Sequence, residues 1–292
     1  MRVFAALLAA ACVGGSVSAQ PGPLPDAETF FARARERLAS NELLQNRYAF
    51  KERRTDIRLN PLGHMGTGSL LLYEVYPSVE PAMTYRRLIQ RDGTPVAEAE
   101  LTAQDDAYRR RYHEWRLGLS RENPDERAVR RKRQAATEAK AHAQAKEMVE
   151  LFAFSIERRD TWEGEPAIVV GFAAKPQARP RTRESRVAVV FAGKAWVHET
   201  EHEVMHLEAT TIDDVSFGFG MVAKLNEGAK TSMTRRRVNQ AWLPAETRFS
   251  GNGRALLLRK VAINYVREYF DYRPFDPNDP PPIPGLASAS SR

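Results

Sequence analysis

The segment VSFGFGMVAKL, residues 215–225, decides the fold. Apolar or small aliphatic side chains occupy every odd position, and Val222 alone interrupts the polar or glycine residues at the even positions. Side chains alternate between the two faces of a β-strand, so this pattern predicts a strand with one apolar face. The odd positions are Val215, Phe217, Phe219, Met221, Ala223 and Leu225.

Segments on both sides of this stretch also predict strands. β-Branched and aromatic residues are concentrated near 47–58, 68–76 and 83–91, again after Leu151, and in a long segment that begins at Leu257. A further strand is predicted at 187–191. The turn signals between strands are Asp92-Gly93, Glu163-Gly164, Gly193-Lys194 and Gly251-Asn252-Gly253.

Helical periodicity occurs at two places. Asp26 precedes an apolar stripe that contains Phe30, Phe31 and Ala34, which predicts a capped N-terminal helix. Residues 98 to about 150 predict a helical insertion, with a seam of apolar and aromatic residues followed by the cap signal Asn123-Pro124. The expected fold class is mainly β (α+β), one antiparallel domain with an N-terminal helix and a central helical insertion. The seam residues are Leu101, Tyr108, Tyr112 and Trp115.

The first nineteen residues have the features of a secretory signal peptide. Arg2 precedes an apolar stretch from Val3 to Val13, and Val17-Ser18-Ala19 fits the small-residue cleavage rule. We therefore expect an exported, periplasmic protein whose single domain covers residues 20–275. Cys12 is the only cysteine and lies within this signal, so the mature chain has no thiolate ligand. The residues before it resemble a lipoprotein box only faintly, and a soluble form is preferred to a lipid-anchored one.

The net charge and the hydropathy of the chain indicate which classes of binding partner to expect. Lys and Arg number 44 against 37 Asp and Glu, which gives a formal net charge of +7. A basic protein often binds nucleic acid, but an exported one rarely meets it, so we expect no nucleic acid. The cationic cluster Arg127–Arg133 fits either an anionic membrane surface or a solvated helix face. No apolar run reaches the roughly 18 residues of a membrane-spanning helix, and the proline-rich segment 276–292 is expected to be disordered.

One motif suggests catalysis. His202-Glu203-Val204-Met205-His206 matches the HExxH pattern, in which two histidines one helical turn apart hold zinc and the glutamate activates its water. Glu227 lies near where some zinc peptidases have their third ligand. The flanking segments predict strands, however, and a strand separates residues four apart by about 13 Å. We therefore expect no metal, no cofactor and no catalytic residue, and a zinc-dependent hydrolase is kept as the alternative.

Short motifs along the chain follow a shared order. The sequence resembles a group of exported bacterial proteins similar to the outer-membrane lipoprotein-sorting (LolA/LolB-like) superfamily, over residues 27–275. The motifs are Tyr85-Arg86-Arg87-Leu88-Ile89, Asp92-Gly93-Thr94-Pro95, Gly193-Lys194-Ala195-Trp196, Leu207-Glu208, Phe217-Gly218-Phe219-Gly220, Leu225-Asn226-Glu227-Gly228, Trp242-Leu243-Pro244, Gly253-Arg254 and Tyr269-Phe270-Asp271-Tyr272-Arg273-Pro274-Phe275.

The resemblance implies a curved antiparallel half-barrel sheet, closed by helices over an apolar concave face, with a strand over 196–209. Better-known members of the superfamily shield the acyl chains of lipoproteins crossing the periplasm, and an envelope-stress regulator uses the fold as a sensor. The insertion at 98–150 departs from the family, and no lid residue is placed on it.

We therefore expect a non-catalytic binding or carrier protein for an acyl chain or lipoprotein anchor, because an apolar concave face must be covered by a helix or a ligand. Besides the zinc-dependent hydrolase, a sensor or interaction module of the same fold remains an alternative, and the sequence names no partner protein. The residues expected on the cavity face are Val215, Phe217, Phe219 and Met221.

Overall fold

The computed structural model describes residues 22–41, 44–59, 65–217, 223–255 and 259–286. The strands are β1 (Tyr48–Leu59), β2 (Met65–Tyr76), β3 (Tyr85–Arg91), β4 (Thr94–Pro95), β5 (Phe152–Trp162), β6 (Glu165–Ala174), β7 (Phe191–His198), β8 (Val204–Thr211), β9 (Val215–Phe217), β10 (Ala223–Leu225), β11 (Lys230–Val238), β12 (Ala241–Ala255) and β13 (Arg259–Pro274). The helices are α1 (Ala27–Asn41), α2 (Glu98–Arg121), α3 (Pro124–Leu151) and α4 (Arg183–Ala188), with 3-10 turns at Gln45–Arg47 and Pro81–Met83.

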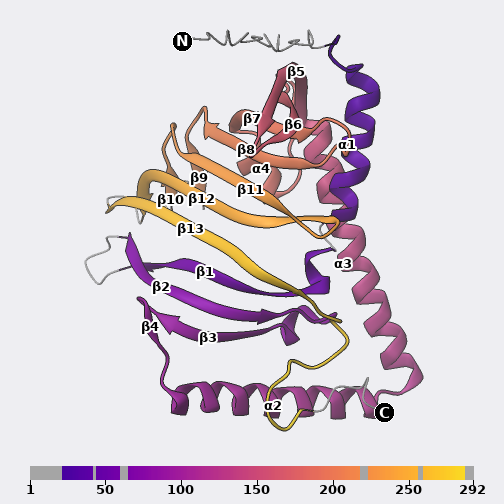
Figure 1. Ribbon diagram of the computed structural model, residues 1–292, viewed down its shortest axis with the longest axis vertical. Helices are drawn as coiled ribbons and strands as arrows, with labels where there is room; N and C mark the ends of the chain where they lie inside the picture. The colour runs from indigo at the N-terminus through magenta and orange to yellow at the C-terminus, as the bar shows by residue number, and fades with distance from the viewer. Residues whose placement is uncertain (1–21, 42–43, 60–64, 218–222, 256–258, 287–292) are drawn as a thin grey trace, which may run out of the picture.

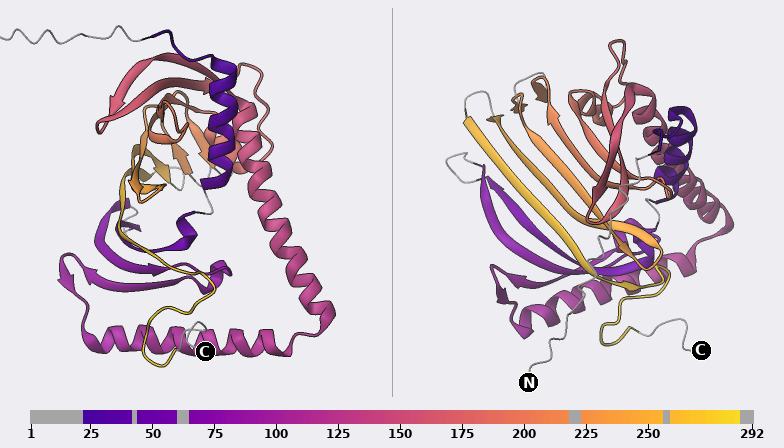
Figure 2. Two further views of the ribbon diagram at one scale, coloured as in Figure 1. Left: turned by 45° about the vertical axis from the view of Figure 1, so that its right-hand side comes forward. Right: turned by 45° about the horizontal axis from the view of Figure 1, so that its top comes forward.

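The described strands form one antiparallel sheet (Figure 1). Its order is β4-β3-β2-β1-β13-β12-β11-β8-β7-β6-β5, and β9 and β10 pair beside β12. The first and last long strands, β1 and β13, are neighbours in the middle of the sheet. The sheet curves and stays open between β4 and β5 (Figure 2), so the expected α+β half-barrel is confirmed.

The helices lie around one side of the sheet. α1 lies at the β5–β8 end, α2 lies along the β3 end, and α3 runs from the corner with α2 back toward β5 (Figures 1 and 2). The Asp26 carboxylate caps α1 by accepting a hydrogen bond from the Thr29 N–H at 2.9 Å. Asn123 and Glu126 form a capping box at the start of α3, with Pro124 in the first turn. The N-terminal helix and the helical insertion are therefore confirmed.

Buried polar contacts join α2 to the sheet. Arg87 of β3 donates two hydrogen bonds, each of 2.9 Å, to the Asp105 carboxylate, and the Tyr85 hydroxyl donates a third. The Tyr108 hydroxyl donates to the Met83 carbonyl at 3.0 Å. The seam predicted on this helix thus faces the β3 end of the sheet.

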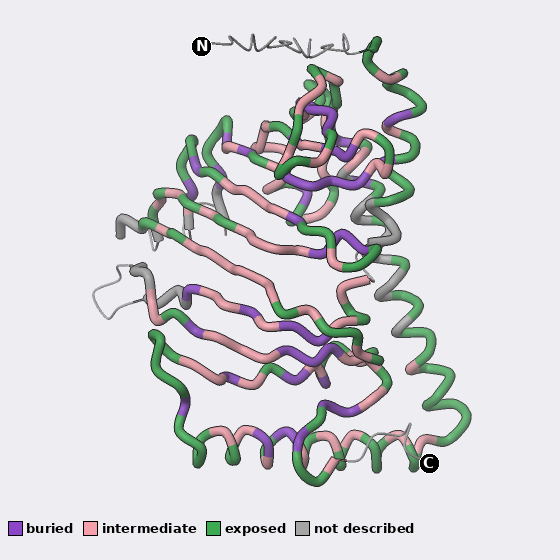
Figure 3. Tube along the Cα trace, viewed as in Figure 1, coloured by how far each residue is buried: buried purple, intermediate pink, exposed green. Residues whose placement is uncertain are grey.

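The apolar core is divided into several clusters. The α1 cluster packs Phe30 and Ala34 against β6, β7 and β8 through Ile168, Val170, Ala195, Val197 and Val204. The α2 cluster consists of Ala49, Tyr76, Met83, Tyr85, Tyr108 and Ile283. Figure 3 shows buried residues on the strands and on one side of α2, whereas most of the described part of α3 is exposed. The two ends of the sheet therefore bury separate sets of side chains.

The structure corrects the prediction of one continuous strand over 215–225. The segment contains two short strands, β9 and β10, which pair antiparallel in the register Val215↔Leu225 and Phe217↔Ala223. Each pair joins two odd-numbered residues, so the apolar alternation stays in phase across the hairpin. Periodicity alone therefore does not distinguish this hairpin from a straight strand.

Of the predicted turns, Asp92-Gly93 and Glu163-Gly164 are confirmed. All four residues have positive φ angles, between 48° and 87°, as tight hairpin turns require. The other two predictions are wrong, because Gly193 lies inside β7 and Gly251-Asn252-Gly253 lies inside β12.

These glycines in strands serve close backbone approach. A Cβ atom on Gly193 would lie 1.9 Å from the Glu208 carbonyl oxygen, and one on Gly253 would lie 2.1 Å from the Lys224 carbonyl oxygen. The strand predicted at 187–191 is also wrong, because 183–188 forms the short helix α4, which begins with a capping box at Thr182.

The chain ends fall partly outside the described residues. The predicted signal peptide, 1–19, lies wholly outside them. The segment predicted to be disordered from residue 276 is described as far as Leu286. There Ile283 is buried in the α2 cluster, and the Arg109 guanidinium donates to the Pro284 carbonyl at 2.9 Å.

Candidate functional site

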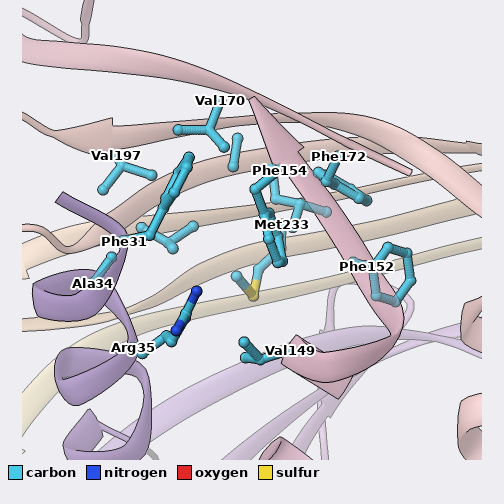
Figure 4. Close-up of a pocket in the computed structure, with 13 residues that line it drawn as sticks. Phe31, Ala34, Arg35, Val149, Phe152, Phe154, Val170, Phe172, Val197 and Met233 are labelled. Atoms are coloured by element: carbon cyan, nitrogen blue, oxygen red, sulfur yellow. The ribbon is translucent and has the colours of Figure 1, made fainter. Parts of the chain in front are cut away.

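An apolar pocket opens between α1, the last turn of α3 and the β5–β8 end of the sheet (Figure 4). Its volume is about 270 Å³, close to the lower limit of small-molecule sites, which is about 300 Å³. Of the described residues that line it, twelve are apolar and one is charged. They are Phe31, Ala34, Arg35, Val149, Phe152, Phe154, Val170, Phe172, Ala195, Val197, Val204, Leu207 and Met233.

Strand register brings the floor of the pocket together. Val170, Ala195, Leu207 and Met233 stand opposite one another on β6, β7, β8 and β11. Directly paired residues project to the same face of a sheet. These strands are separated by helices and turns in the sequence, so the floor exists only in the folded sheet.

Helix spacing and strand alternation supply the walls. Phe31, Ala34 and Arg35 are three and four residues apart on α1, so they share one helix face. Phe152 and Phe154 alternate on β5, and their rings pack against Phe172 at 5.9 Å and against Phe31 at 5.8 Å between centroids. Phe154 remains 37% exposed at the sheet edge, which leaves part of this aromatic wall accessible.

Arg35 is the one charged residue among the described residues that line the pocket. Figure 4 shows its guanidinium group directed from α1 toward the side chains inside the pocket. Within the described residues the structure records no hydrogen bond or ion pair for it. An apolar cavity with one available cation suits a ligand that has a long apolar part and an anionic group.

The cavity face predicted from the sequence is not part of this pocket as described. Val215 is buried in a separate cluster with Leu225 and Ala229. Phe217 lies on β9, but its side chain is outside the described part of the structure, and Phe219 and Met221 lie wholly outside the described residues. This assignment stays a prediction.

Sequence reasoning missed the pocket residues, although one signal was available. Phe152, Phe154 and Ile156 alternate with Ala153 and Ser155 directly after the helical insertion. This is the period of a strand with one apolar face. The contribution of α1 was not visible, because an apolar helix stripe does not reveal what it packs against.

The HExxH residues adopt a geometry that zinc chemistry does not use. His202 lies in a turn with a φ angle of 60°, and β8 begins two residues later, so the required helix is not formed. The structure corrects the implied single strand over 196–209, which is the end of β7 and the beginning of β8 with this turn between them. Among the described residues, no group of three or more His, Cys, Asp or Glu side chains is arranged to hold a metal ion.

Each polar member of the motif has a structural contact. Glu203 pairs with Arg235 at 3.1 Å, and both side chains are buried. The His206 ring stacks on Trp162, with 3.8 Å between ring centroids, and its Nδ1 lies 2.9 Å from the Thr234 hydroxyl. The His202 ring packs against Phe30 of α1 at 5.1 Å. The motif therefore stabilises the turn, the strand and the docking of α1.

The basic residues at 127–133 lie on the exposed part of α3. Arg130 forms an ion pair with Glu122 at 2.8 Å, and the described neighbours on this helix face solvent. Contact of this cluster with an anionic membrane surface stays a prediction. No helix among the described residues combines the length and apolar character needed to cross a membrane.

We find no protein-family model and no curated protein that matches the chain. Among solved structures, a DUF1329 family protein from Desulfovibrio piger shares 8% identity, with 84% of this chain and 92% of that chain covered and a TM-score of 0.29. A LolA superfamily protein from Nitrosomonas europaea shares 10% identity, with 86% and 94% covered and a TM-score of 0.29.

MucB, in a structure of its complex with MucA, shares 10% identity, with 86% of this chain and 100% of that chain covered and a TM-score of 0.21. At these TM-scores the likenesses carry no functional argument.

Proposed function

We propose that this protein is an exported, periplasmic binding or carrier protein that holds an acyl chain, free or as a lipoprotein anchor, without catalysis. The observation that carries the proposal is the pocket itself, whose described lining consists of twelve apolar residues and one cation. Its shape comes from α1 lying over the sheet. Movement of α1 would therefore control the entry of the acyl chain into the pocket.

The energetics fit an acyl chain better than a polar ligand. Each methylene group moved from water into an apolar site contributes about 0.8 kcal/mol, so a chain gains affinity with every carbon it buries. A polar ligand would lose its hydration and find few partners, because Arg35 is the only polar side chain among the described lining residues.

The first experiment is native mass spectrometry of residues 20–292 purified gently from the periplasm. We expect an adduct of lipid mass that disappears on solvent extraction. The bare polypeptide mass, with no rebinding of added palmitate, would overturn the proposal and favour the sensor or interaction module. A single zinc mass that a chelator removes would favour the hydrolase.

A matched pair of variants tests the pocket assignment. Phe154→Asp places a carboxylate at a partly exposed position of the wall, where the fold tolerates it, and should lower palmitate affinity at least tenfold. Leu117→Asp makes the same change at an exposed apolar residue of α2, away from the pocket, and should bind as the wild type does. Equal affinity of both variants would contradict the assignment.

The cavity face predicted from the sequence has its own test. If Val215, Phe217, Phe219 and Met221 line a cavity for the same chain, Phe219→Asp should abolish ligand retention in a well-folded protein. Retention by that variant, together with loss in Phe154→Asp, would assign binding to the α1 pocket alone.

A further inference from the structure

Two arginines, Arg267 and Arg54, lie on the pocket face of the sheet, beyond its apolar part. Residues that pair directly on neighbouring strands form a row across the sheet. Paired residues project to the same face, so the whole row lies on the face that carries the pocket floor. From the floor it continues through Thr247 of β12 to β13 and β1. Its members are Val170, Ala195, Leu207, Met233, Thr247, Arg267, Arg54 and Leu71.

The distance between the two parts suits one amphiphilic molecule. Met233 and Arg267 are two strands apart, and neighbouring strands lie about 4.8 Å apart, so about 10 Å separates the pocket floor from the first arginine. Arg54 lies one strand further. Apolar and cationic regions thus follow each other along the same face.

The arginine patch, defined as Arg54, Arg86 and Arg267, is centred on Glu52. Arg267 approaches the Glu52 carboxylate at 3.3 Å, Arg54 approaches it at 3.7 Å, and Arg86 forms a hydrogen bond with it. The Glu52 side chain is fully buried, whereas each arginine side chain is about one third exposed or more. The three guanidinium groups carry three positive charges and Glu52 carries one negative charge, so the patch has a net charge of about +2.

Neighbouring acids do not cancel this excess. Glu268 pairs with Arg53, and Glu74 lies near Arg87, so these carboxylates of β13 and β2 have other cationic partners. One arginine is enough to pair a buried glutamate. The three partly exposed guanidinium groups around Glu52 therefore have N–H donors that a second anion could use.

A buried hydroxyl beside the patch has no hydrogen-bond partner. Among the described residues, the Tyr265 hydroxyl lacks a hydrogen bond, whereas Glu52 Oε1 and Arg267 Nε, which also lack one, contact each other as an ion pair at 3.3 Å. Native proteins satisfy nearly all such atoms, with ligands and water included. Tyr265 lies beneath the Arg267 guanidinium at 5.3 Å, so its hydroxyl belongs to the same group.

Aromatic rings hold the arginines in place. The Arg54 guanidinium lies 4.8 Å from the centre of the Tyr73 ring, and Arg267 donates to the Tyr269 hydroxyl at 3.3 Å. Such contacts orient the planar guanidinium and leave its outer N–H groups for an oxyanion.

We infer that the arginine patch binds the phosphate of a phospholipid-type ligand whose acyl chain occupies the pocket. A phosphate monoester carries about −1.5 to −2 at neutral pH, which matches the uncompensated charge of the patch. The inference rests on the proposed function and specifies the chemical class of its ligand.

The experiment compares two lipids that differ in the phosphate, bound to delipidated protein of residues 20–292. The probes are phosphatidic acid and a diacylglycerol with the same short acyl chains. The wild type should bind phosphatidic acid at least tenfold more tightly, and this preference should shrink as salt is raised. Arg267→Gln and, separately, Arg54→Gln should each reduce the preference several-fold and leave diacylglycerol affinity unchanged.

An arginine of the same sheet that lies outside the patch provides the control. Arg248→Gln removes an exposed arginine of β12 that pairs with Glu246, and it should keep the full preference. Circular dichroism and Tm establish that each variant is folded. Equal wild-type affinity for both lipids would overturn this inference and leave the proposed function intact, whereas binding of neither lipid would overturn both. Binding of inorganic phosphate that Arg267→Gln abolishes, with no lipid preference, would identify a free-phosphate site and overturn the headgroup assignment.

Discussion

Glu203 and Arg235 form a buried ion pair whose members depend on each other. Burial lowers the pKa of the Arg235 guanidinium, and the Glu203 carboxylate opposes this effect. Glu203→Ala leaves a buried cation without its partner, which typically costs about 3–5 kcal/mol. We expect a loss of this size in the free energy of unfolding, measured by urea denaturation.

Glu208→Ala is the matched control on β8, the strand that follows Glu203 directly, because the Glu208 carboxylate is 60% exposed and its contact with His206 is open to solvent. Its cost should stay within about 0.5 kcal/mol. A Glu203→Ala protein as stable as this control would contradict the importance of the buried pair.

At the residue scale, the sequence shows which side chains are present in a motif but not how they are arranged in space. His202, Glu203 and His206 match a zinc motif, yet the turn at His202 places them in a hairpin and gives each a structural contact. Caps were predictable because they are local. Asp26 and Asn123 form hydrogen bonds within three residues of themselves, so the sequence contains both partners.

At the element scale, replacing glycine by alanine should change the stability of the protein in opposite directions at two positions. Gly193→Ala forces a Cβ atom against the backbone of β8, at 1.9 Å from a carbonyl oxygen, so β7 and β8 must separate. Overpacking of this kind costs about 1–3 kcal/mol, and here the upper end or more is expected. Gly118→Ala in α2 meets no atom within 4 Å and should stabilise by about 0.5–1 kcal/mol. Thermal unfolding of the two variants measures both effects, and a stabilised Gly193→Ala would contradict the register of β7 and β8.

The docking of α1 should depend on pH through His202. Burial lowers the pKa of His202, and Arg33 and Arg37 of α1 and the neighbouring His198 lower it further, while a backbone hydrogen bond with Thr200 opposes them. The unfolded chain therefore binds the proton more readily than the folded chain does. The contribution is complete above the ordinary pKa, about 6.5, and falls as the pH decreases from there toward the lowered folded pKa.

Urea unfolding between pH 7.5 and 5 measures this dependence. His202→Gln should flatten it, whereas His113→Gln, which changes an exposed histidine of α2, should not. An unchanged pH profile in His202→Gln would exclude the proposed linkage between this imidazole and α1.

The elements themselves were more predictable than their ends. Extended structure was correctly predicted at 215–217 and 223–225, but the two segments pair with each other, and antiparallel pairing between residues of the same parity preserves the alternation. Glycine is common in turns, so the sequence favours turns at Gly193 and Gly253. Only the carbonyl groups opposite them, at Glu208 and Lys224, show that these two glycines belong to strands. Those contacts lie between strands, where local sequence provides no information.

At the scale of the whole molecule, the fold class followed from local patterns, whereas the strand order did not. β1 and β13 pair although Tyr48 and Pro274 stand at opposite ends of the domain. The candidate site depends on this order, because the pocket floor and the arginine patch become neighbours only through pairing across β11, β12, β13 and β1. No periodicity within one segment contains that information.

The divided core predicts a local response to ligand. The α1 cluster borders the pocket, whereas the α2 cluster is built from other strands and the C-terminal segment. A ligand stabilises the states that bind it, and regions that open independently gain protection only where they contact it. Palmitate should therefore slow hydrogen exchange in α1, β7 and β8 and leave α2 unchanged. Phe154→Asp should remove the effect in the same experiment. Equal protection of α1 and α2 would show instead that the whole sheet opens as one cooperative unit, and the pocket would then be coupled to the helical insertion through β1 and β13.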